Sequence, residues 1–259
     1  MGLPDLPYVA SGFGIGLLVG LTGVGGGSLT TPLLVLLFGI SPTAAVGTDL
    51  LFAAITKSVG ALVHGAKQTL DWRITRRLWA GSLPGAALTL GLLYAFNARG
   101  HTYASIISAL LGVALILTAA SILFRGRILA VISRSGPETP TRHTAWLTVV
   151  TGIAVGVLVS LTSIGAGAIG MTALILLYPR LPLARLVGSD IAHAVPLTLL
   201  AGAGHIVLGT VNWAVLGSLL VGSVPGIVAG SALVGWTPAA LLQLLLAFTI
   251  LYAGIRLLM

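Results

Sequence analysis

Cysteine is absent from this chain of 259 residues, and charged residues are scarce. Without cysteine there are no disulfides, no thiol catalysis and no thiolate metal sites. Charged residues make up 7% of the chain, whereas a soluble domain carries about 25%. Apolar residues reach 57%, and the mean hydropathy is +1.10. Several apolar runs exceed the roughly 18 residues that mark a candidate membrane-spanning helix. The sequence therefore predicts an all-α polytopic membrane protein.

Acidic residues are especially few. Five Asp and Glu stand against 13 Lys and Arg, which gives a net charge of +8. In a soluble protein this excess can indicate nucleic-acid binding. Here we attribute it to basic loops, because the cytoplasmic loops of membrane proteins collect Lys and Arg. We expect membrane lipid around the chain, and no nucleic acid, cofactor or metal ion as a partner.

The chain contains an internal duplication. Five short motifs occur twice and in the same order. The matching segments are 21–27 with 161–167, 47–49 with 188–190, His64 with His205, 69–72 with 210–213, and 81–85 with 222–226. Generic apolar sequence produces one such match by chance but not five in order. We predict two homologous halves, residues 1–134 and 145–259, joined by a cytoplasmic linker over 135–144.

Each half divides into five apolar segments at glycine, proline and charged breaks. The expected segments are 8–22, 28–39, 43–66, 74–97 and 102–124, then 145–162, 168–178, 183–208, 214–233 and 238–258. A helix of 12 residues covers about 18 Å, well under the ~30 Å hydrocarbon core. We therefore expect the first two segments of each half to form a broken or re-entrant hairpin that turns at the glycine motif.

The basic residues predict the orientation of the chain. Alternating sides from the N-terminus places ten Lys and Arg on one side, and Arg99 and Arg256 on the other. The positive-inside rule makes the first side cytoplasmic, so both termini are expected outside. Because five segments are an odd number, the second half enters the membrane from the opposite face. Two inverted repeats with broken helices are a recurring plan of secondary transporters, whose substrate binds near the midplane between the repeats.

The glycine motifs are the predicted substrate site. Glycine lets the backbone approach a ligand closely, and a helix that begins just after each break directs unpaired N–H groups at the ligand. Such a site suits a small anion. The candidate binding residues are Gly25, Gly26, Gly27, Ser28, Thr31, Lys57, Gly165 and Gly167. The alternative is that these glycines only allow helices to cross closely.

Ionisable residues inside the predicted spans form a second group of candidates, because the membrane makes them costly. Lys57 is interpreted as a positive charge for the anion, as a side chain that reaches the cytoplasmic interface, or as the partner of an aspartate. Asp49 and His64 lie about 22 Å apart along one helix, so they cannot share a site within their own half. Inversion instead places Asp49 with His205. It likewise places Asp190 with His64.

We hypothesise that these two Asp–His clusters act as gates or proton relays, with protons as a candidate coupling ion, since histidine titrates near neutral pH. The alternative is a structural role for both pairs. His193 is expected to pack between helices with one hydrogen bond. The segments 71–72 and 212–213 are expected to form turns followed by interfacial tryptophan anchors.

The sequence resembles the TauE/SafE sulfite exporter family, the four-toluene sulfonate uptake permease group. The resemblance is carried by Gly25-Gly26-Gly27 leading to 32–34, by 45–48, by 70–73 and by 84–85, with their echoes in the second half. It covers nearly the whole chain. It implies transport of a small sulfur-containing oxyanion, sulfite or an organosulfonate, across the bacterial inner membrane, so that both termini would be periplasmic.

Three other functions are compatible with parts of the pattern. A passive anion channel would use the same helix-terminus site. A metal-cation transporter usually converges several carboxylates, but only Asp49 and Asp190 are embedded, at opposite depths. An intramembrane serine hydrolase would need Ser28 within reach of a histidine base, and His64 and His205 are expected near the mouths. We therefore expect a transporter rather than an enzyme; the oligomeric state and the direction of transport stay open.

Overall fold

A computed structural model describes residues 5–22, 27–66, 68, 70–96, 101–132, 142–232 and 239–259 of the chain. These residues form ten helices and no strand. In chain order they are α1 (Leu6–Thr22), α2 (Gly27–Leu36), α3 (Pro42–Ala66), α4 (Trp72–Ala95), α5 (His101–Ile132), α6 (Arg142–Thr162), α7 (Ile169–Leu177), α8 (Leu183–Val207), α9 (Trp213–Ala232) and α10 (Ala239–Leu258). Five helices are long and apolar enough to cross a membrane. The predicted all-α membrane architecture is confirmed.

The helix boundaries follow the breaks in the sequence. Each predicted segment is a helix, and nine of them agree with the predicted ends to within three residues. The exception is α5, which continues to Ile132 rather than ending at residue 124. Arginine is a good helix former, so the basic residues at 125 and 127 do not end the helix. The helix α6 begins at Arg142, inside the predicted linker.

The outward faces of the helices are apolar. Large exposed side chains include Leu88 and Leu92 on α4, Val224 and Val228 on α9, and Phe248 on α10. Soluble monomers rarely expose apolar patches larger than a few hundred Å². A surface of this kind suits contact with lipid.

One polar residue caps the start of the fourth helix in each half. The carboxylate of Asp71 accepts hydrogen bonds from two backbone N–H groups in the first turn of α4, at 3.0 and 3.3 Å. The side-chain oxygen of Asn212 accepts one in the first turn of α9, at 3.2 Å. The tryptophans that follow, Trp72 and Trp213, are exposed. Both sites thus have a capping residue followed by an exposed tryptophan, and the role of these tryptophans as interfacial anchors remains a prediction.

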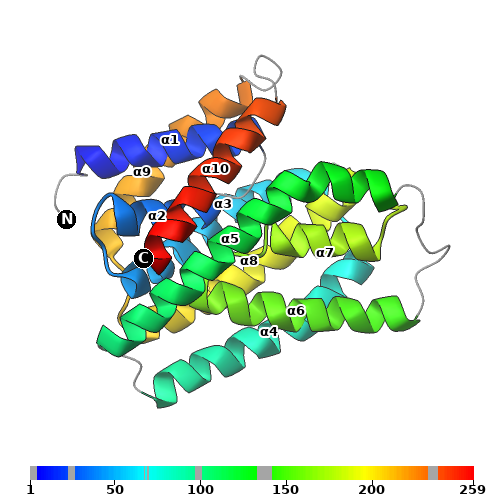
Figure 1. Ribbon diagram of the computed structural model, residues 1–259, viewed down its shortest axis with the longest axis horizontal. Helices are drawn as coiled ribbons and strands as arrows, with labels where there is room; N and C mark the ends of the chain where they lie inside the picture. Colours follow the sequence, from blue (N-terminus) through cyan, green and yellow to red (C-terminus); the bar gives the residue numbers. More distant parts are fainter. Residues whose placement is uncertain are drawn as a thin grey trace.

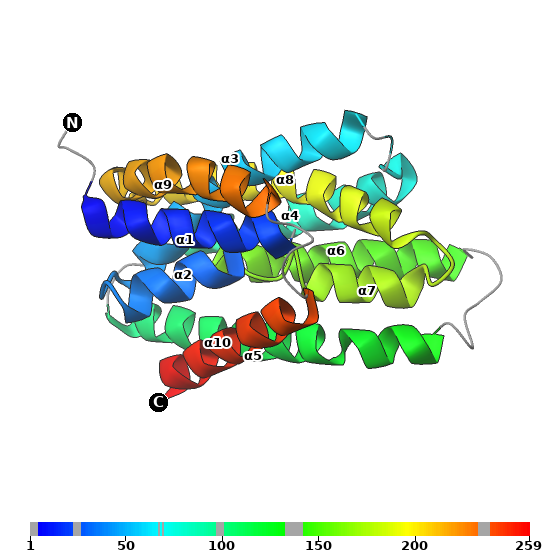
Figure 2. The same cartoon turned by 90° about the horizontal axis from the view of Figure 1, so that it is seen from above.

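The helices of the two halves pack together in reciprocal pairs. The first helix of each half packs on the fourth helix of the other, α1 on α9 and α6 on α4. The third helices, α3 and α8, pack on each other, and so do the fifth helices, α5 and α10. Figure 2 shows α1–α2 at one end of the long axis and α6–α7 at the other, between α5 and α10 on one side and the remaining helices on the other.

Glycines allow the close contact of the outer pairs. A Cβ on any of eight glycines would press on a backbone oxygen of the facing helix. They are Gly12 and Gly16 of α1, Gly152 and Gly156 of α6, Gly81 and Gly85 of α4, and Gly222 and Gly226 of α9. Gly12 lies against Leu219, and Gly16 against Ser223, so α1 and α9 run parallel. The repeated segments 81–85 and 222–226 are therefore helix-crossing motifs, as small residues often are in membranes.

The central pair runs in the opposite sense. Gly47 of α3 lies beside His205 of α8, and further along α3 Leu51 lies beside Gly202. The helices α3 and α8 are therefore antiparallel. Parallel outer pairs around an antiparallel central pair are the directions that an inverted repeat predicts.

Reciprocal hydrogen bonds tie these central helices to the other half. The Thr48 hydroxyl of α3 accepts a hydrogen bond of 3.0 Å from the backbone N–H of Asn212, which caps α9. The equivalent hydroxyl, that of Ser189 in α8, accepts one of 2.9 Å from the N–H of Asp71, which caps α4. Thus the hydroxyl of each repeated Gly-Thr/Ser-Asp motif holds the start of the fourth helix of the opposite half.

Candidate substrate site

The predicted substrate site lies at the two helix breaks. Gly25 and Gly26 lie outside the described residues, as do the side chains of Ser28 and His64. The helix α2 begins at Gly27 and α7 begins at Ile169, each within one residue of its predicted start. The first N–H groups of a helix lack partners within the helix, and an anion is one kind of group that accepts hydrogen bonds from them.

The second break has a sharply turned backbone. Ser163 adopts φ = 60°. Gly165 adopts φ = 125°, a backbone conformation that residues other than glycine rarely adopt. The Thr162 hydroxyl accepts a hydrogen bond from the N–H of Ile164, at 3.2 Å. The N–H of Gly170 donates to the carbonyl of Gly165, at 2.8 Å, as α7 begins. Gly165 is therefore required for the turn itself.

The start of α2 lies near the break of the second half. Leu29, in the first turn of α2, packs in the same apolar cluster as Ile164 of the second break. Other members of the cluster come from α5 and α10, for example Leu111 and Ile250. The start of α2 and the break before α7 thus pack against the pair of fifth helices.

Asp49 is completely buried in α3, where it faces the start of α2. The Thr31 hydroxyl donates a hydrogen bond of 2.6 Å to Asp49 Oδ2. The hydroxyls of Thr30 and Ser163 also lie next to this carboxyl. Asp49 Oδ1 and Ser163 Oγ nevertheless have no hydrogen-bond partner within the described part of the chain. An aspartate of the first half thus lies beside the break of the second half.

Asp190 occupies the equivalent place in α8. It is 5% exposed and faces the first turn of α7, where a Cβ on Gly170 would lie 3.1 Å from Asp190 Oδ1. Among the described residues this oxygen also has no hydrogen-bond partner. Each half therefore directs one buried carboxyl at the beginning of its own short helix.

Lys57 of α3 supplies the positive charge between the two carboxyls. Its ammonium interacts electrostatically with Asp190 and Asp49. His193 of α8 lies within the same electrostatic range. We call these four residues, Asp49, Lys57, Asp190 and His193, the central cluster. The two aspartates lie at different levels along the antiparallel pair α3 and α8, as the motif pairs predict, and Lys57 lies at a level between them.

His193 has the environment expected from the sequence. Its Nε2 lies 2.8 Å from Ser82 Oγ of α4, and its Nδ1 has no partner within the described ranges. The indole N–H of Trp79 donates to the His193 carbonyl, at 3.2 Å. The residue therefore joins α8 to α4 through one side-chain hydrogen bond, as a helix-packing histidine does.

His205 has other partners than the hypothesis gave it. Its Nδ1 lies 2.8 Å from Thr210 Oγ1, and its Nε2 lies 2.9 Å from the Ser160 carbonyl. Both ring nitrogens are thus occupied, and neither bonds to Asp49. Inversion did place His205 at the level of Asp49, because it lies beside Gly47. The imidazole instead joins α8 to α6 and to the α8–α9 connection. The pairing of Asp190 with His64 remains a prediction.

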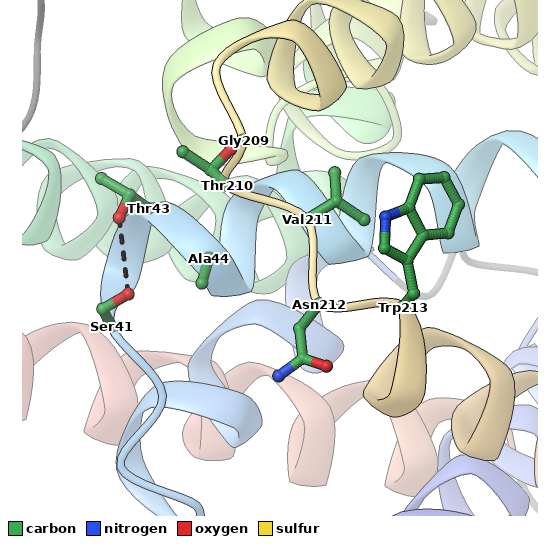
Figure 3. Close-up of a pocket in the computed structure, with 8 residues that line it drawn as sticks. All are labelled: Ser41, Thr43, Ala44, Gly209, Thr210, Val211, Asn212 and Trp213. Carbon is green, nitrogen blue, oxygen red and sulfur yellow. Dashed lines mark hydrogen bonds between the residues drawn. The ribbon is translucent and has the colours of Figure 1, made fainter. Parts of the chain in front are cut away.

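A pocket of about 430 Å³ opens next to His205. Its lining comes from the start of α3 and from the α8–α9 connection (Figure 3). The lining residues are Ser41, Thr43, Ala44, Gly209, Thr210, Val211, Asn212 and Trp213. None of them is charged, and Thr210 also bonds to His205. Sequence motifs did not indicate Ser41 and Thr43; the Ser-Pro step that begins α3 is the signal that marks this position.

Comparison with known proteins assigns the chain to a family. The model of the sulfite exporter TauE/SafE family matches residues 8–257. The probable membrane transporter protein YjnA of Bacillus subtilis is 38% identical over 257 residues, which is 98% of this chain and 99% of the relative. The probable membrane transporter protein YdhB of the same organism is 30% identical over 207 residues, 79% of this chain and 80% of the relative. No solved structure matches. The chain is a membrane transporter of the TauE/SafE sulfite exporter family.

Proposed function

We propose that this protein is a secondary transporter that moves a small sulfur-containing oxyanion, sulfite or an organosulfonate, across the bacterial inner membrane. The substrate class comes from the family. The observation that carries the proposal is the packing of the start of α2 near the break before α7, beside the buried carboxyl of Asp49. Transport by this route leaves the anion chemically unchanged.

The anion binds where α2 and α7 begin. The positive dipole ends of these helices favour negative charge. The ammonium of Lys57 adds a full positive charge, and the Thr31 hydroxyl lies in the second turn of α2. An inverted pair of halves then alternates between two equivalent states, each of which opens the site to one face of the membrane.

Both termini are proposed to be periplasmic. Helix α10 ends at the end of the molecule where α1 begins, while α5 ends and α6 begins at the other (Figure 1). Arg77 of α4 lies at that second end, because its guanidinium donates to the Tyr178 hydroxyl, which bonds to Thr148 of α6. The positive-inside rule makes this arginine-bearing end cytoplasmic.

The test is counterflow of radiolabelled sulfite in proteoliposomes. Thr31→Val removes the hydroxyl at the site with little change in shape. Thr249→Val is the matched control, because the Thr249 hydroxyl is exposed and bonds only within α10. We expect saturable counterflow in the wild type and the control, and a loss of at least tenfold in apparent affinity in Thr31→Val.

The outcomes separate the candidate functions. A passive channel would conduct the anion without counterflow. Counterflow of methanesulfonate or sulfate in place of sulfite would keep the carrier and change its substrate. No exchange with any of these anions would refute the proposed function.

A further inference from the structure

The central cluster carries an excess of negative charge at a site proposed to bind an anion. Two carboxylates, Asp49 and Asp190, stand against the ammonium of Lys57, for a net charge of −1 when all three are ionised. A monovalent anion would double this negative charge. Buried like charges repel strongly, because the interior screens them poorly. One proton on the cluster restores the charge of the empty state.

Each carboxyl has one buried oxygen at which a proton can bind. Asp49 Oδ2 accepts the Thr31 hydrogen bond, but Asp49 Oδ1 has no partner among the described residues, and the same is true of Asp190 Oδ1. An ionised carboxylate without partners is expensive to bury, and protonation removes that charge. The protonated oxygen would also donate: the unpartnered Ser163 Oγ lies next to Asp49.

No other charged side chain faces these carboxyls within the described ranges. Lys57 is the one charged group that interacts electrostatically with either of them. Of the arginines on α4, Arg73 and Arg76 are exposed, and Arg77 bonds to Tyr178. Facing Asp49, α2 presents only hydroxyls.

Neither His193 nor His205 bonds to these carboxyls, and His143 is exposed at the start of α6. His205 lies near Asp49, but both of its ring nitrogens have partners. His193 bonds to Ser82. The side chains of α5 and α9 that the structure describes include no titratable group. The carboxyls of the cluster are thus the groups placed to bind a proton beside the anion.

We propose that the anion binds at the starts of α2 and α7 only when Asp49 or Asp190 is protonated, so that each monovalent anion is carried together with at least one proton. The proton comes from water at one face and returns to water at the other, and no bond of the anion breaks. Lys57 keeps the remaining carboxylate ionised. This inference rests on the proposed function and adds to it the coupling ion and the residues that carry it.

The experiment uses the full chain in proteoliposomes with the membrane voltage held at zero. Counterflow first identifies an anion that is exchanged; methanesulfonate is preferred for the next step, because it does not itself take up protons near neutral pH. A gradient of one pH unit, acid outside, is then imposed. For one proton per anion we expect about tenfold accumulation, since one pH unit is a tenfold difference in proton activity.

The variants locate the proton. In Asp49→Asn/Asp190→Asn we expect counterflow to persist and the accumulation to fall to about onefold. Asp5→Asn, which changes an exposed aspartate at the start of the chain, is the matched control and should keep the tenfold accumulation. Gel filtration of each variant before reconstitution checks that it is folded.

Each outcome has a separate meaning. No counterflow with any anion refutes the proposed function. Counterflow in the wild type without accumulation under the pH gradient overturns the proton coupling and leaves the transporter standing, and this comparison needs no variant. Accumulation driven by a sodium gradient instead also overturns it. Tenfold accumulation that persists in the double variant overturns the assignment to these two carboxyls.

Discussion

The reciprocal hydrogen bonds of Thr48 and Ser189 allow a direct test of how the halves are joined. Thr48→Val keeps the shape of the side chain and removes the acceptor of the Asn212 N–H. Ser189→Ala removes the acceptor of the Asp71 N–H. Thr48 and Ser189 are completely buried, so a replacement partner from solvent is not expected.

The expected loss of stability follows from the backbone N–H that each substitution leaves without an acceptor. A buried N–H that loses its acceptor costs about 1–3 kcal/mol of stability. Contacts along the antiparallel helices place the level of Ser189 about 15 residues from Thr48, or roughly 23 Å. Sites more than about 10 Å apart without shared partners add to within ~0.5 kcal/mol. We therefore expect the double variant to lose the sum of the two single losses.

Reversible unfolding of the detergent-solubilised protein by SDS, followed by circular dichroism, measures these losses. Thr249→Val is the control and should change the free energy of unfolding by less than about 0.5 kcal/mol, since that hydroxyl is exposed. A change equally small in Thr48→Val would refute the view that this hydrogen bond joins the halves. A double variant far from additive would show that the two links are not independent.

Three further predictions concern single positions. Gly222→Leu should prevent assembly at a cost above ~3 kcal/mol, because its side chain would overlap the Val9 backbone, whereas Gly217→Leu on the same helix meets nothing within 4 Å and should run normally on gel filtration. Lys57→Gln should raise the KM for anion exchange at least tenfold at similar protein stability, and unchanged exchange would remove the lysine from the site. His205→Ala should destabilise the protein by about 2–4 kcal/mol in the SDS assay through two lost hydrogen bonds, and a loss under 0.5 kcal/mol would contradict its bridging role.

Much of this fold is readable from sequence because membrane helices end where apolar runs end. Glycine, proline and charged breaks marked all ten helices of the described residues. The length of α5 was missed, since arginine at a membrane surface can continue a helix as easily as end it. Repeat spacing also put His205 at the level of Asp49.

The sequence did not predict which hydrogen-bond partner a buried polar side chain has among the groups at the same depth. His205 bonds to the carbonyl of Ser160, and a backbone carbonyl has no signature in the sequence. The threonine of the Gly-Thr-Asp motif was passed over in favour of the aspartate, yet Thr48 forms the link between halves. Searching for charged residues finds groups that are costly in a membrane but not the neutral groups that satisfy the backbone.

Equivalent positions of the two halves differ in whether their residues join helices or carry charge. Thr48 and Ser189, which match in the two halves, each accept a hydrogen bond from the backbone N–H that precedes the fourth helix of the opposite half. Such symmetric contacts are expected of an inverted-repeat transporter. Lys57 breaks the symmetry, because its counterpart Thr198 only bonds back to its own helix. Lys57 thus adds a charge to the first half that the second half does not reproduce. Under the proposed coupling, the direction of net transport follows the gradients of anion and proton, and Lys57 is the positive charge that the proposed anion meets.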